Sequence, residues 1–271
     1  VKVAFSAVNG TVDKTGPVFV TLWKDGHYAT AAEGGQGTLT ADQIATATAN
    51  PGFSFNHWTP SEPTTSLPLT QDTEFVAVFT ENAEVTIQYN AGTGGSVSLG
   101  SETLAPATGV AQGSTATAAT GYHFVNWTNE AQEVVSTDPT FVPAKDTGVY
   151  TAATYTANFA PDTDTGYTVN HWQENLDNSQ YTLAETEVKN GTTGAMTEAA
   201  AKNYAGFTAQ AFVQETIAAD GSTVVDIYYR RNLYTATVKY VDEETGAEIA
   251  GEKVLTSVKH GTTIRGEDHR I

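Results

Sequence analysis

The sequence has no cysteine among its 271 residues. Disulfide bonds, thiol catalysis and cysteine-ligated metal sites are therefore excluded. It also has no run of about 18 apolar residues, so no segment is expected to span a membrane. Small β-rich domains that lack disulfides need another source of stability, which leaves large aromatic side chains and packing between neighbouring modules.

Basic residues are scarce: 13 Lys and Arg stand against 31 Asp and Glu, giving a formal net charge of -18. The acidic residues are spread along the chain and do not form a tail. Because phosphate backbones and anionic lipid surfaces would be repelled, we expect no nucleic-acid partner and no membrane contact. The same charge favours a soluble monomer.

Signatures of catalysis are missing as well. The sequence has no G-x-S-x-G motif, no phosphate-binding loop, no dinucleotide fingerprint and no H-E-x-x-H. Carboxylates are plentiful but scattered, and a glycosidase also needs a cleft that holds the sugar between its acidic pair. We therefore predict a protein that is not an enzyme.

What the sequence does contain is a repeat. Residues 45–59 read ATATANPGFSFNHWT, and residues 114–128 read STATAATGYHFVNWT. Each block has a Thr/Ala strand, a Gly-aromatic turn and an aromatic strand that ends in Trp; a closing strand that ends in Phe follows after a polar gap. The matching positions are Trp58 with Trp127 and Phe79 with Phe159. One supersecondary plan is therefore used twice.

Two later blocks start alike but differ from the first two. Residues 166–188 read GYTVNHWQENLDNSQYTLAETEV, a hairpin pattern with the polar turn NLDNS. Residues 234–263 read YTATVKYVDEETGAEIAGEKVLTSVKHGTT, in which DEETG takes the place of NLDNS. The last block stops before any closing strand.

Strand patterns dominate. Apolar and polar residues alternate in residues 85–90, 154–159 and 234–240, which favours antiparallel strands with one buried and one wet face. Helix signals are short: residues 196–203 would form two turns and residues 40–45 one. We predict a mainly β fold, α+β at most.

The blocks define the expected domains. We predict modules at residues 1–82, 83–161 and 162–233, with a partial, truncated fourth module at 234–271. These would be small β-grasp-like or β-sandwich-like units arranged as an elongated rod.

The first two blocks, carrying GFSFNHWT…FVAVF and GYHFVNWT…YTANF, resemble the divergent internalin-B-type B-repeats of bacterial surface proteins. YTVNHWQENLDNSQYTLAETE and TVKYVDEETGAEIAGEKV, in the later blocks, look like mucin-binding-protein repeats. The resemblance implies small β-rich modules, often β-grasp-like, strung as stalk or adhesive regions of large cell-wall-attached proteins. It brings no catalytic residues.

The repeated aromatics have two readings. A position that every module repeats is most simply a core anchor, so we predict Trp58, Trp127, Phe79 and Phe159 as anchors. The alternative is that the tryptophans, Trp172 included, stack on sugar rings as the aromatics of lectins do.

Trp23, in VTLWKDG, has no counterpart in the other modules. It is therefore the candidate for an exposed aromatic side chain that binds a ligand. The partner would be a host or cell-surface glycoprotein or glycan.

No cofactor is expected, with calcium at a module boundary as the alternative. PDTDTG places Asp162 and Asp164 two residues apart before a glycine, which echoes the start of a calcium loop. The closing Glu is not obvious, although Glu174 lies further on. The tripeptide NHW occurs twice, but its histidines belong to different modules, and zinc needs three or four convergent ligands.

A covalent cross-link between a Lys amine and an Asn amide is another way to stabilise a module that lacks cysteine. Lys14, Lys24 or Lys145 would supply the amine, and Asn90 or Asn158 the amide. Such a bond also needs a neighbouring acid, and the sequence shows no such triad.

Together these observations predict a non-catalytic, extracellular repeat region of a bacterial cell-surface protein. It would act as a stalk or spacer and as an adhesin segment, and it would be attached to the cell wall through regions outside this chain. The alternative is a glycan- or mucin-binding, lectin-like module that uses exposed aromatics. The chain starts at Val1 without a leader-like segment, so we expect a piece of a longer protein.

Overall fold

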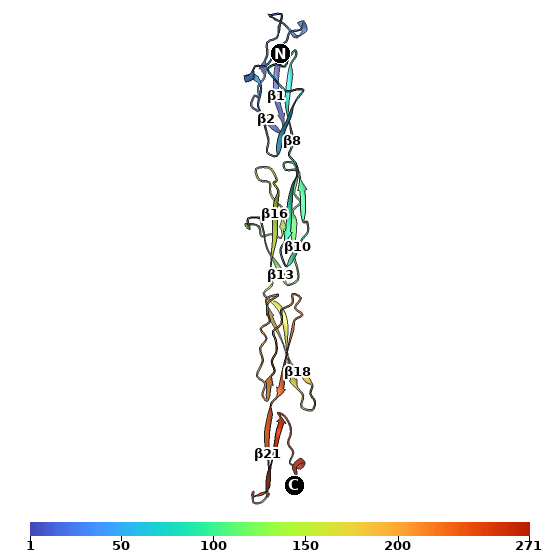
Figure 1. Cartoon of the computed structure of the whole chain (residues 1–271), viewed down its shortest axis with the longest axis vertical. Helices are drawn as coiled ribbons and strands as arrows, with labels where there is room; N and C mark the ends of the chain where they lie inside the picture. Colours follow the sequence, from blue (N-terminus) through green and yellow to red (C-terminus); the bar gives the residue numbers. More distant parts are fainter. The chain divides into compact units, whose positions relative to one another are not determined.

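The computed structural model describes residues 1–271, and it is built almost entirely from β-strands (Figure 1). It has no α-helix; three short 3-10 helices are η1 (Ala31–Glu33), η2 (Ala41–Gln43) and η3 (Gly266–His269). None of these helices is long and apolar enough to cross a membrane. The strands form several small, separate sheets in tandem modules, which confirms the mainly β prediction.

The chain divides into two compact units. Unit 1 comprises Val1–Gly92, Ser96–Thr117 and Val125–Asn158, and unit 2 comprises Thr93–Gly95, Ala118–Phe124 and Phe159–Ile271. Four strands carry residues of both units: β10 (Gly95–Val97), β12 (Ser114–Ala118), β13 (Tyr122–Thr128) and β16 (Ala153–Pro161). The strand groups described next are called modules, and each is defined by its strands.

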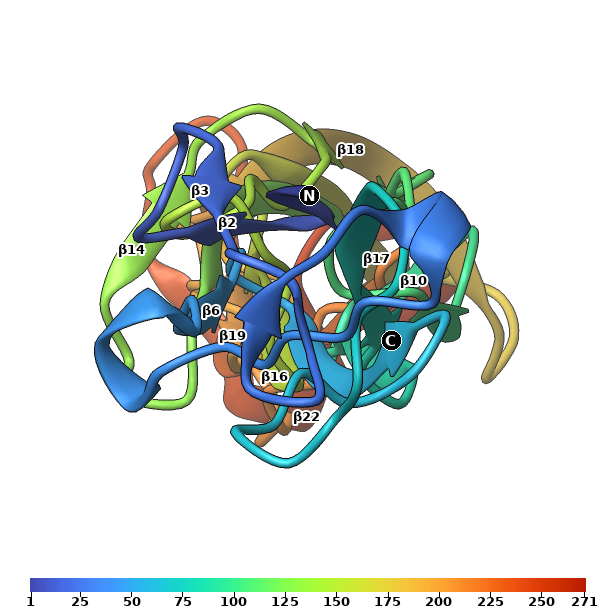
Figure 2. The ribbon, with the colours of Figure 1, turned by 90° about the horizontal axis from the view of Figure 1, so that it is seen from above.

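The first module contains eight strands, and β3 lies close to the N-terminus (Figure 2). Its strands are β1 (Lys2–Val8), β2 (Gly10–Val12), β3 (Val18–Phe19), β4 (Trp23–Lys24), β5 (His27–Tyr28), β6 (Ala47–Ala49), β7 (Phe53–Thr59) and β8 (Thr73–Glu81). They form a four-stranded sheet in the order β3-β1-β8-β7 and the pairs β2-β6 and β4-β5. The core gathers the inward residues of β1, β7 and β8 around Phe5 and Phe75.

The second module also has eight strands. They are β9 (Val85–Ala91), β10 (Gly95–Val97), β11 (Ser101–Leu104), β12 (Ser114–Ala118), β13 (Tyr122–Thr128), β14 (Val134–Ser136), β15 (Thr140–Phe141) and β16 (Ala153–Pro161). They make a five-stranded sheet, β11-β9-β16-β13-β14, and a three-stranded sheet, β10-β12-β15.

The third module has four strands, and a hairpin follows it. The strands are β17 (Thr165–Glu174), β18 (Tyr181–Gly191), β19 (Phe207–Ala209) and β20 (Val224–Arg231), and those of the hairpin are β21 (Leu233–Val241) and β22 (Glu248–Lys259). The module's sheet runs β18-β17-β20-β19. Its core is built on Tyr167, Val169, Ile227 and Tyr229.

The three modules share one sheet order. In each, the first strand lies between an antiparallel partner and the last strand, and the strand on the other side of the last is β7, β13 or β19. The first and last strands are parallel in every case: β1 with β8, β9 with β16, and β17 with β20. The sheets are therefore mixed. Alternation in residues 85–90 and 154–159 favoured antiparallel strands, whereas β9 and β16 pair in parallel, because period-two alternation does not report strand direction.

The predicted helical turns at residues 196–203 do not form. Backbone N–H groups in this segment bond outward instead: Thr197 donates to the Glu215 carbonyl, Glu198 to the Tyr167 hydroxyl and Lys202 to the Tyr229 hydroxyl. Because these three N–H groups already donate to residues distant in sequence, they cannot form the hydrogen bonds of a helix. The segment is an extended cover over the core of the third module.

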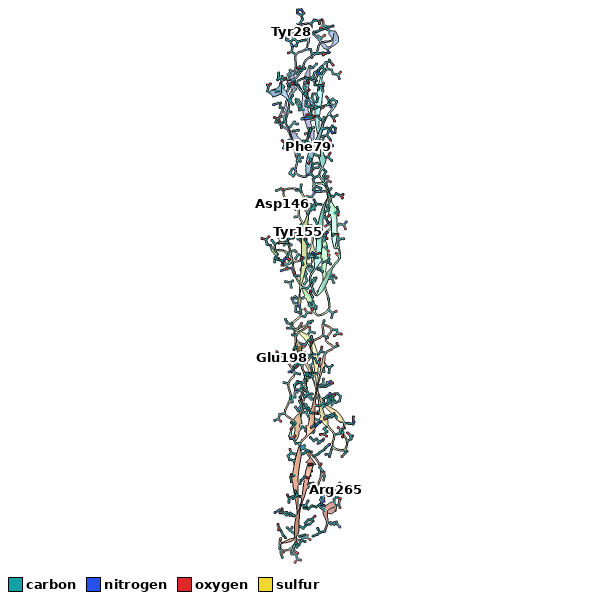
Figure 3. All side chains as sticks on the ribbon, viewed as in Figure 1. Tyr28, Phe79, Asp146, Tyr155, Glu198 and Arg265 are labelled. Atoms are coloured by element: carbon teal, nitrogen blue, oxygen red, sulfur yellow. The ribbon has the colours of Figure 1, made fainter.

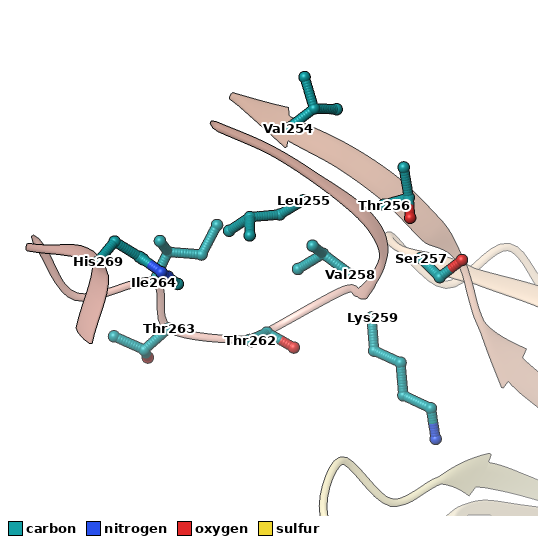
Figure 4. Close-up of a pocket in the computed structure, with 10 residues that line it drawn as sticks. All are labelled: Val254, Leu255, Thr256, Ser257, Val258, Lys259, Thr262, Thr263, Ile264 and His269. Atoms are coloured by element: carbon teal, nitrogen blue, oxygen red, sulfur yellow. The ribbon is translucent and has the colours of Figure 1, made fainter. Parts of the chain in front are cut away.

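Strand β21 has a partner on one side only, since it pairs with β22 in a two-stranded sheet. A cavity of about 660 Å³ lies between β22 and the segment that follows it. Leu255, Val258 and Ile264 line this cavity, whereas Lys259 points away (Figure 4). The hairpin resembles the β17–β18 half of the third module, and the partial fourth module at residues 234–271 stays a prediction.

Candidate functional site

The most regular feature of the molecule is a joint that occurs three times, where one module ends and the next strand begins. Each joint starts from a β-turn whose third residue is a glycine with positive φ: Gly52, Gly121 and Gly206, at +82°, +75° and +80°. In each turn the N–H of the following aromatic residue donates to the carbonyl three residues back, at 3.1 Å. Only glycine adopts this backbone without strain, which explains the Gly-aromatic pattern of the sequence.

The glycine carbonyl accepts the N–H of the residue that follows the closing strand. Asn82 donates to Gly52, Asp162 to Gly121 and Asn232 to Gly206, in each case at 2.8 Å. The same backbone bond therefore ties the end of each module to its own turn. The chain leaves each module at a fixed point.

A side-chain bond reinforces each joint. The residue two positions after the glycine contacts the side-chain oxygen of the joint residue: Ser54 Oγ donates to Asn82 Oδ1 at 2.6 Å, and Thr208 Oγ1 donates to Asn232 Oδ1 at 2.6 Å. In the second joint, His123 Nδ1 lies 2.8 Å from Asp162 Oδ1. The second joint thus replaces a neutral bond with a pair that becomes an ion pair when the imidazole is protonated.

The glycines also touch the next part of the chain. A Cβ placed on Gly52 would lie 2.9 Å from Ala107 Cβ, and one on Gly121 would lie 2.8 Å from Ala219 Cβ. A Cβ on Gly206 would meet the ring of His260 at 2.1 Å. Glycine is therefore required twice over, for the turn and for the close approach of the neighbouring module.

Glu81 adds a clamp to the first joint. Its carboxylate accepts the backbone N–H of Ala107 at 2.7 Å, the N–H of Thr108 at 2.8 Å and the Thr108 hydroxyl at 2.7 Å. The bonds from Thr108, from its backbone first and then its hydroxyl, hold the pKa of Glu81 below its ordinary value. The ionised carboxylate is the form that closes the joint.

The third joint has its own clamp. Glu174 accepts the Lys259 ammonium at 2.7 Å and the Arg231 N–H at 2.8 Å, and the bond from Lys259, then that from Arg231, lowers its pKa. The Arg231 guanidinium spans to the carbonyl oxygens of Glu174 and His260. The end of the β21–β22 hairpin is therefore bonded to the third module through Lys259 and the His260 carbonyl, at the end of β22.

We expect the first joint to loosen in acid. A carboxyl group whose pKa is lower in the folded state stabilises that state above its ordinary pKa, here 4.5, and this contribution is lost as the pH falls through the folded value. The amide resonances of Ala107 and Thr108 should therefore move in NMR spectra recorded on the acid side of that range. In a Glu81→Gln chain both resonances should lack this titration; a titration that persists in the variant would contradict the clamp.

Trp58 and Trp127 lie in the cores. Trp127 is fully buried between Tyr89 and Phe141, with ring centroids at 6.1 and 5.7 Å, and its Nε1 donates to the Pro139 carbonyl at 3.0 Å. Trp58 is buried against Phe5 at 5.8 Å. The two indoles face inward in their own modules and share no cavity.

The closing phenylalanines sit over glycines. A Cβ on Gly10 would approach the Phe79 ring to 2.3 Å, and a Cβ on Gly95 would approach the Phe159 ring to the same distance. Phe79 is buried, whereas Phe159 is partly exposed. A T-shaped aromatic neighbour completes each pair, at 5.6 Å for Phe55 with Phe79 and 5.9 Å for Phe124 with Phe159.

Trp23 is exposed, as expected for a ligand candidate, and it lies on the β4–β5 hairpin. Its ring stacks on Tyr28 with centroids 4.3 Å apart and planes 26° from parallel. Tyr28 lies near the end of unit 1, whereas Phe79 lies among the strands (Figure 3). Neither Trp23 nor Tyr28 belongs to the core of the first module.

The two NHW tripeptides bury different side chains. In the first, His57 is exposed and Trp58 is buried; in the second, His171 is buried and Trp172 is only partly buried. The first tripeptide lies on a penultimate strand with a bulge between Phe55 and His57, and the second lies on a first strand. The two histidines therefore belong to different modules and do not form a shared metal site.

His171 belongs to the core of the third module. Its Nδ1 lies 2.8 Å from the Tyr229 hydroxyl, and its Nε2 lies 3.5 Å from Glu187. Trp172 is on the outer face, where its Nε1 donates to Asp226 at 2.7 Å and its ring stacks on Tyr228. Trp172 and Tyr228 form a second outward aromatic pair.

The carboxylates proposed for calcium are not assembled into a site. No group of three or more His, Asp or Glu side chains in the structure could hold a metal ion. Asp162 is bonded to His123, Asp164 is exposed, and Glu174 stands at the far end of β17, roughly 30 Å along an extended strand. Asp162 instead serves the second joint, a role that sequence reasoning missed.

The lysines considered for a cross-link are engaged elsewhere. Lys24 Nζ donates to the Glu33 carbonyl at 2.7 Å, and Lys145 Nζ donates to the Ala107 carbonyl beside the first joint. Asn158 donates to Asn126 at 2.8 Å and to Thr128 at 3.1 Å. None of these contacts brings a lysine amine to an asparagine amide.

One stretch of the chain matches a known family model. No curated protein matches the chain. Residues 85–163 match the family model of the divergent InlB B-repeat domain, a stretch that contains β9 to β16. The match does not extend to residues 1–82, and it gives no evidence for mucin-binding repeats in the later modules. The chain therefore contains one divergent InlB B-repeat domain, a typically non-catalytic repeat that suggests a bacterial surface protein and is consistent with an extracellular location.

Proposed function

We propose that the chain is a non-catalytic spacer of a bacterial cell-surface protein. In this proposal, stiff joints restrict the bending of the chain between one module and the next. It would keep a distal part of the protein away from the cell wall, to which other regions attach it. The joint that recurs at Asn82, Asp162 and Asn232 is the observation that carries this proposal. A flexible linker would need none of these bonds.

The joints support stiffness because each combines several restraints. A backbone bond, a side-chain bond and a glycine in close contact act on a connection only a few residues long. Each net hydrogen bond is worth only about 1 kcal/mol, but bonds that share one short segment restrict the same few dihedral angles. The acidic surface would keep neighbouring spacers apart at the cell surface.

The absence of cysteine gives a direct test. Spin labels on a Thr48→Cys, Glu130→Cys chain would lie on either side of the first joint, at two exposed positions. We expect a narrow distance distribution by pulsed dipolar spectroscopy, similar in width to that of a Thr48→Cys, Thr80→Cys pair within the first module. A distribution much broader than that of the control pair would overturn the stiff-joint proposal.

The spacer proposal also entails an elongated particle in solution. Small-angle scattering of the full chain should give a maximum dimension well above that of a compact protein of 271 residues. A compact profile would contradict the spacer function even if the first joint proved stiff. The two measurements therefore separate a stiff joint from an extended chain.

A further inference from the structure

The β4–β5 hairpin is an addition to the common plan of the modules. No two-stranded hairpin of this kind occurs within the second or third module. Asp25 and Gly26 form its tip with positive φ values of +46° and +82°, the geometry of a tight two-residue turn. A feature that the repeated fold does not require is a place where a module can acquire a separate role.

The hairpin presents two bare aromatic rings. Trp23 is 47% exposed and Tyr28 is 77% exposed, although the rings stack on each other. Reciprocal backbone bonds between Trp23 and Gln36, at 2.9 and 3.0 Å, fix the strand, and the adjacent Leu22 is buried. The backbone that carries the indole is therefore fixed, while part of the ring remains exposed to solvent.

A shallow cavity opens beside the indole. Its volume is about 310 Å³, at the lower end of the range for small-molecule sites. The lining residues are Thr21, Trp23, Gln36, Gly37, Thr38 and Pro68. Hydroxyl and amide groups thus surround an aromatic wall, and the lining carries no charge.

We propose that this cavity binds a neutral pyranose at the end of a glycan. The apolar C–H face of a sugar ring would pack on the indole of Trp23, while its hydroxyls would bond to Thr21, Gln36 and Thr38. An uncharged lining on a chain of net charge -18 disfavours sialylated or sulfated sugars. The site lies outside the joints, so it is independent of the spacer function.

The test is titration of the full chain with lactose and with N-acetylglucosamine, followed by saturation-transfer NMR and by tryptophan fluorescence. Binding to at least one of them is expected, with an affinity that falls about tenfold or more in Trp23→Ala, as the loss of an aromatic contact implies. Trp172→Ala is the matched control, because Trp172 is the other partly exposed tryptophan, and it should bind normally. Sialyllactose should bind more weakly than lactose.

Because Trp23 and Tyr28 are cross-strand partners, Trp23→Ala also removes a contact that supports the hairpin. Thr21→Val and Thr38→Val keep the side-chain shape at exposed positions and remove only a hydroxyl. Each should weaken sugar binding several-fold with an unchanged melting temperature. No binding of either neutral sugar, or binding that survives Trp23→Ala, would overturn the proposal, as would equal loss in Trp172→Ala.

Discussion

Replacing Trp127 by alanine is expected to lower the free energy of unfolding of the second module by about 3–5 kcal/mol. The indole is fully buried, and its removal would leave a cavity between Tyr89 and Phe141. The Pro139 carbonyl would also lose one of its two hydrogen-bond donors and keep only the Ala116 N–H. A module of this size has little stability to spare, so the loss should leave it largely unfolded at 37 °C.

Hydrogen exchange of amides in β9 and β16 would measure this effect within the module itself. Trp23→Ala provides the comparison, because Trp23 lies in the first module, outside its core, and its loss should leave the amides of β9 and β16 protected. Protection of β9 that survives in Trp127→Ala would show that the buried indole is not the anchor of this core.

Gly121→Ala is expected to open the second joint. The added Cβ would lie 2.8 Å from both the Cβ and the carbonyl oxygen of Ala219, and φ at this position is +75°. The strain of a left-handed alanine and the overpacking together should cost roughly 2–4 kcal/mol. The bond from the Asp162 N–H to the Gly121 carbonyl would then weaken, so the Asp162 amide should exchange at least tenfold faster.

Gly194→Ala is the matched control for this change. Gly194 has a similar φ of +79°, but nothing lies within 4 Å of its added Cβ, so it carries the backbone strain without the collision. The difference between the two variants isolates the close approach at the joint. Equal exchange rates for Asp162 in both chains would mean that Gly121 makes no essential contact with the neighbouring segment.

The sequence was sufficient to predict the strand content and the inward indoles. Trp58 and Trp127 align because each follows a Gly-aromatic turn at the same spacing, and both lie buried on the strand that neighbours the last strand of their sheet. Alternation in residues 85–90 correctly placed Ile87 and Tyr89 on the buried face. Local periodicity is a reliable guide when a strand has one wet face.

Local periodicity was insufficient where tertiary pairing decides the outcome. NHW exposes its histidine in one module and buries it in another, because β7 is the edge strand of its sheet while β17 lies between two other strands. The Ala-rich segment at residues 196–203 has helical propensity, yet the hydroxyls of Tyr167 and Tyr229 capture its N–H groups. Weak propensity gives way to specific partners distant in sequence.

The joints were visible in the sequence only as the repeated Gly-aromatic turn. Nothing local links Gly52 to Asn82, or Gly121 to Asp162, because each bond joins the two ends of a closing hairpin. Asp162 was therefore considered only as an alternative calcium ligand, whereas its oxygen faces His123. Comparing the residue after each closing strand across the modules would have revealed the polar series Asn, Asp, Asn.

The parallel pairing of first and last strands determines how a module responds to tension. The chain enters by a strand such as β1 and leaves by its neighbour β8, which runs in the same direction, so the entry and exit points lie at opposite ends of the pair. A pull on these two points would load the intervening hydrogen bonds in shear, all at once, whereas a terminal hairpin would be unzipped one bond at a time. The same geometry recurs at β9 with β16 and at β17 with β20, so resistance to pulling is built into each module.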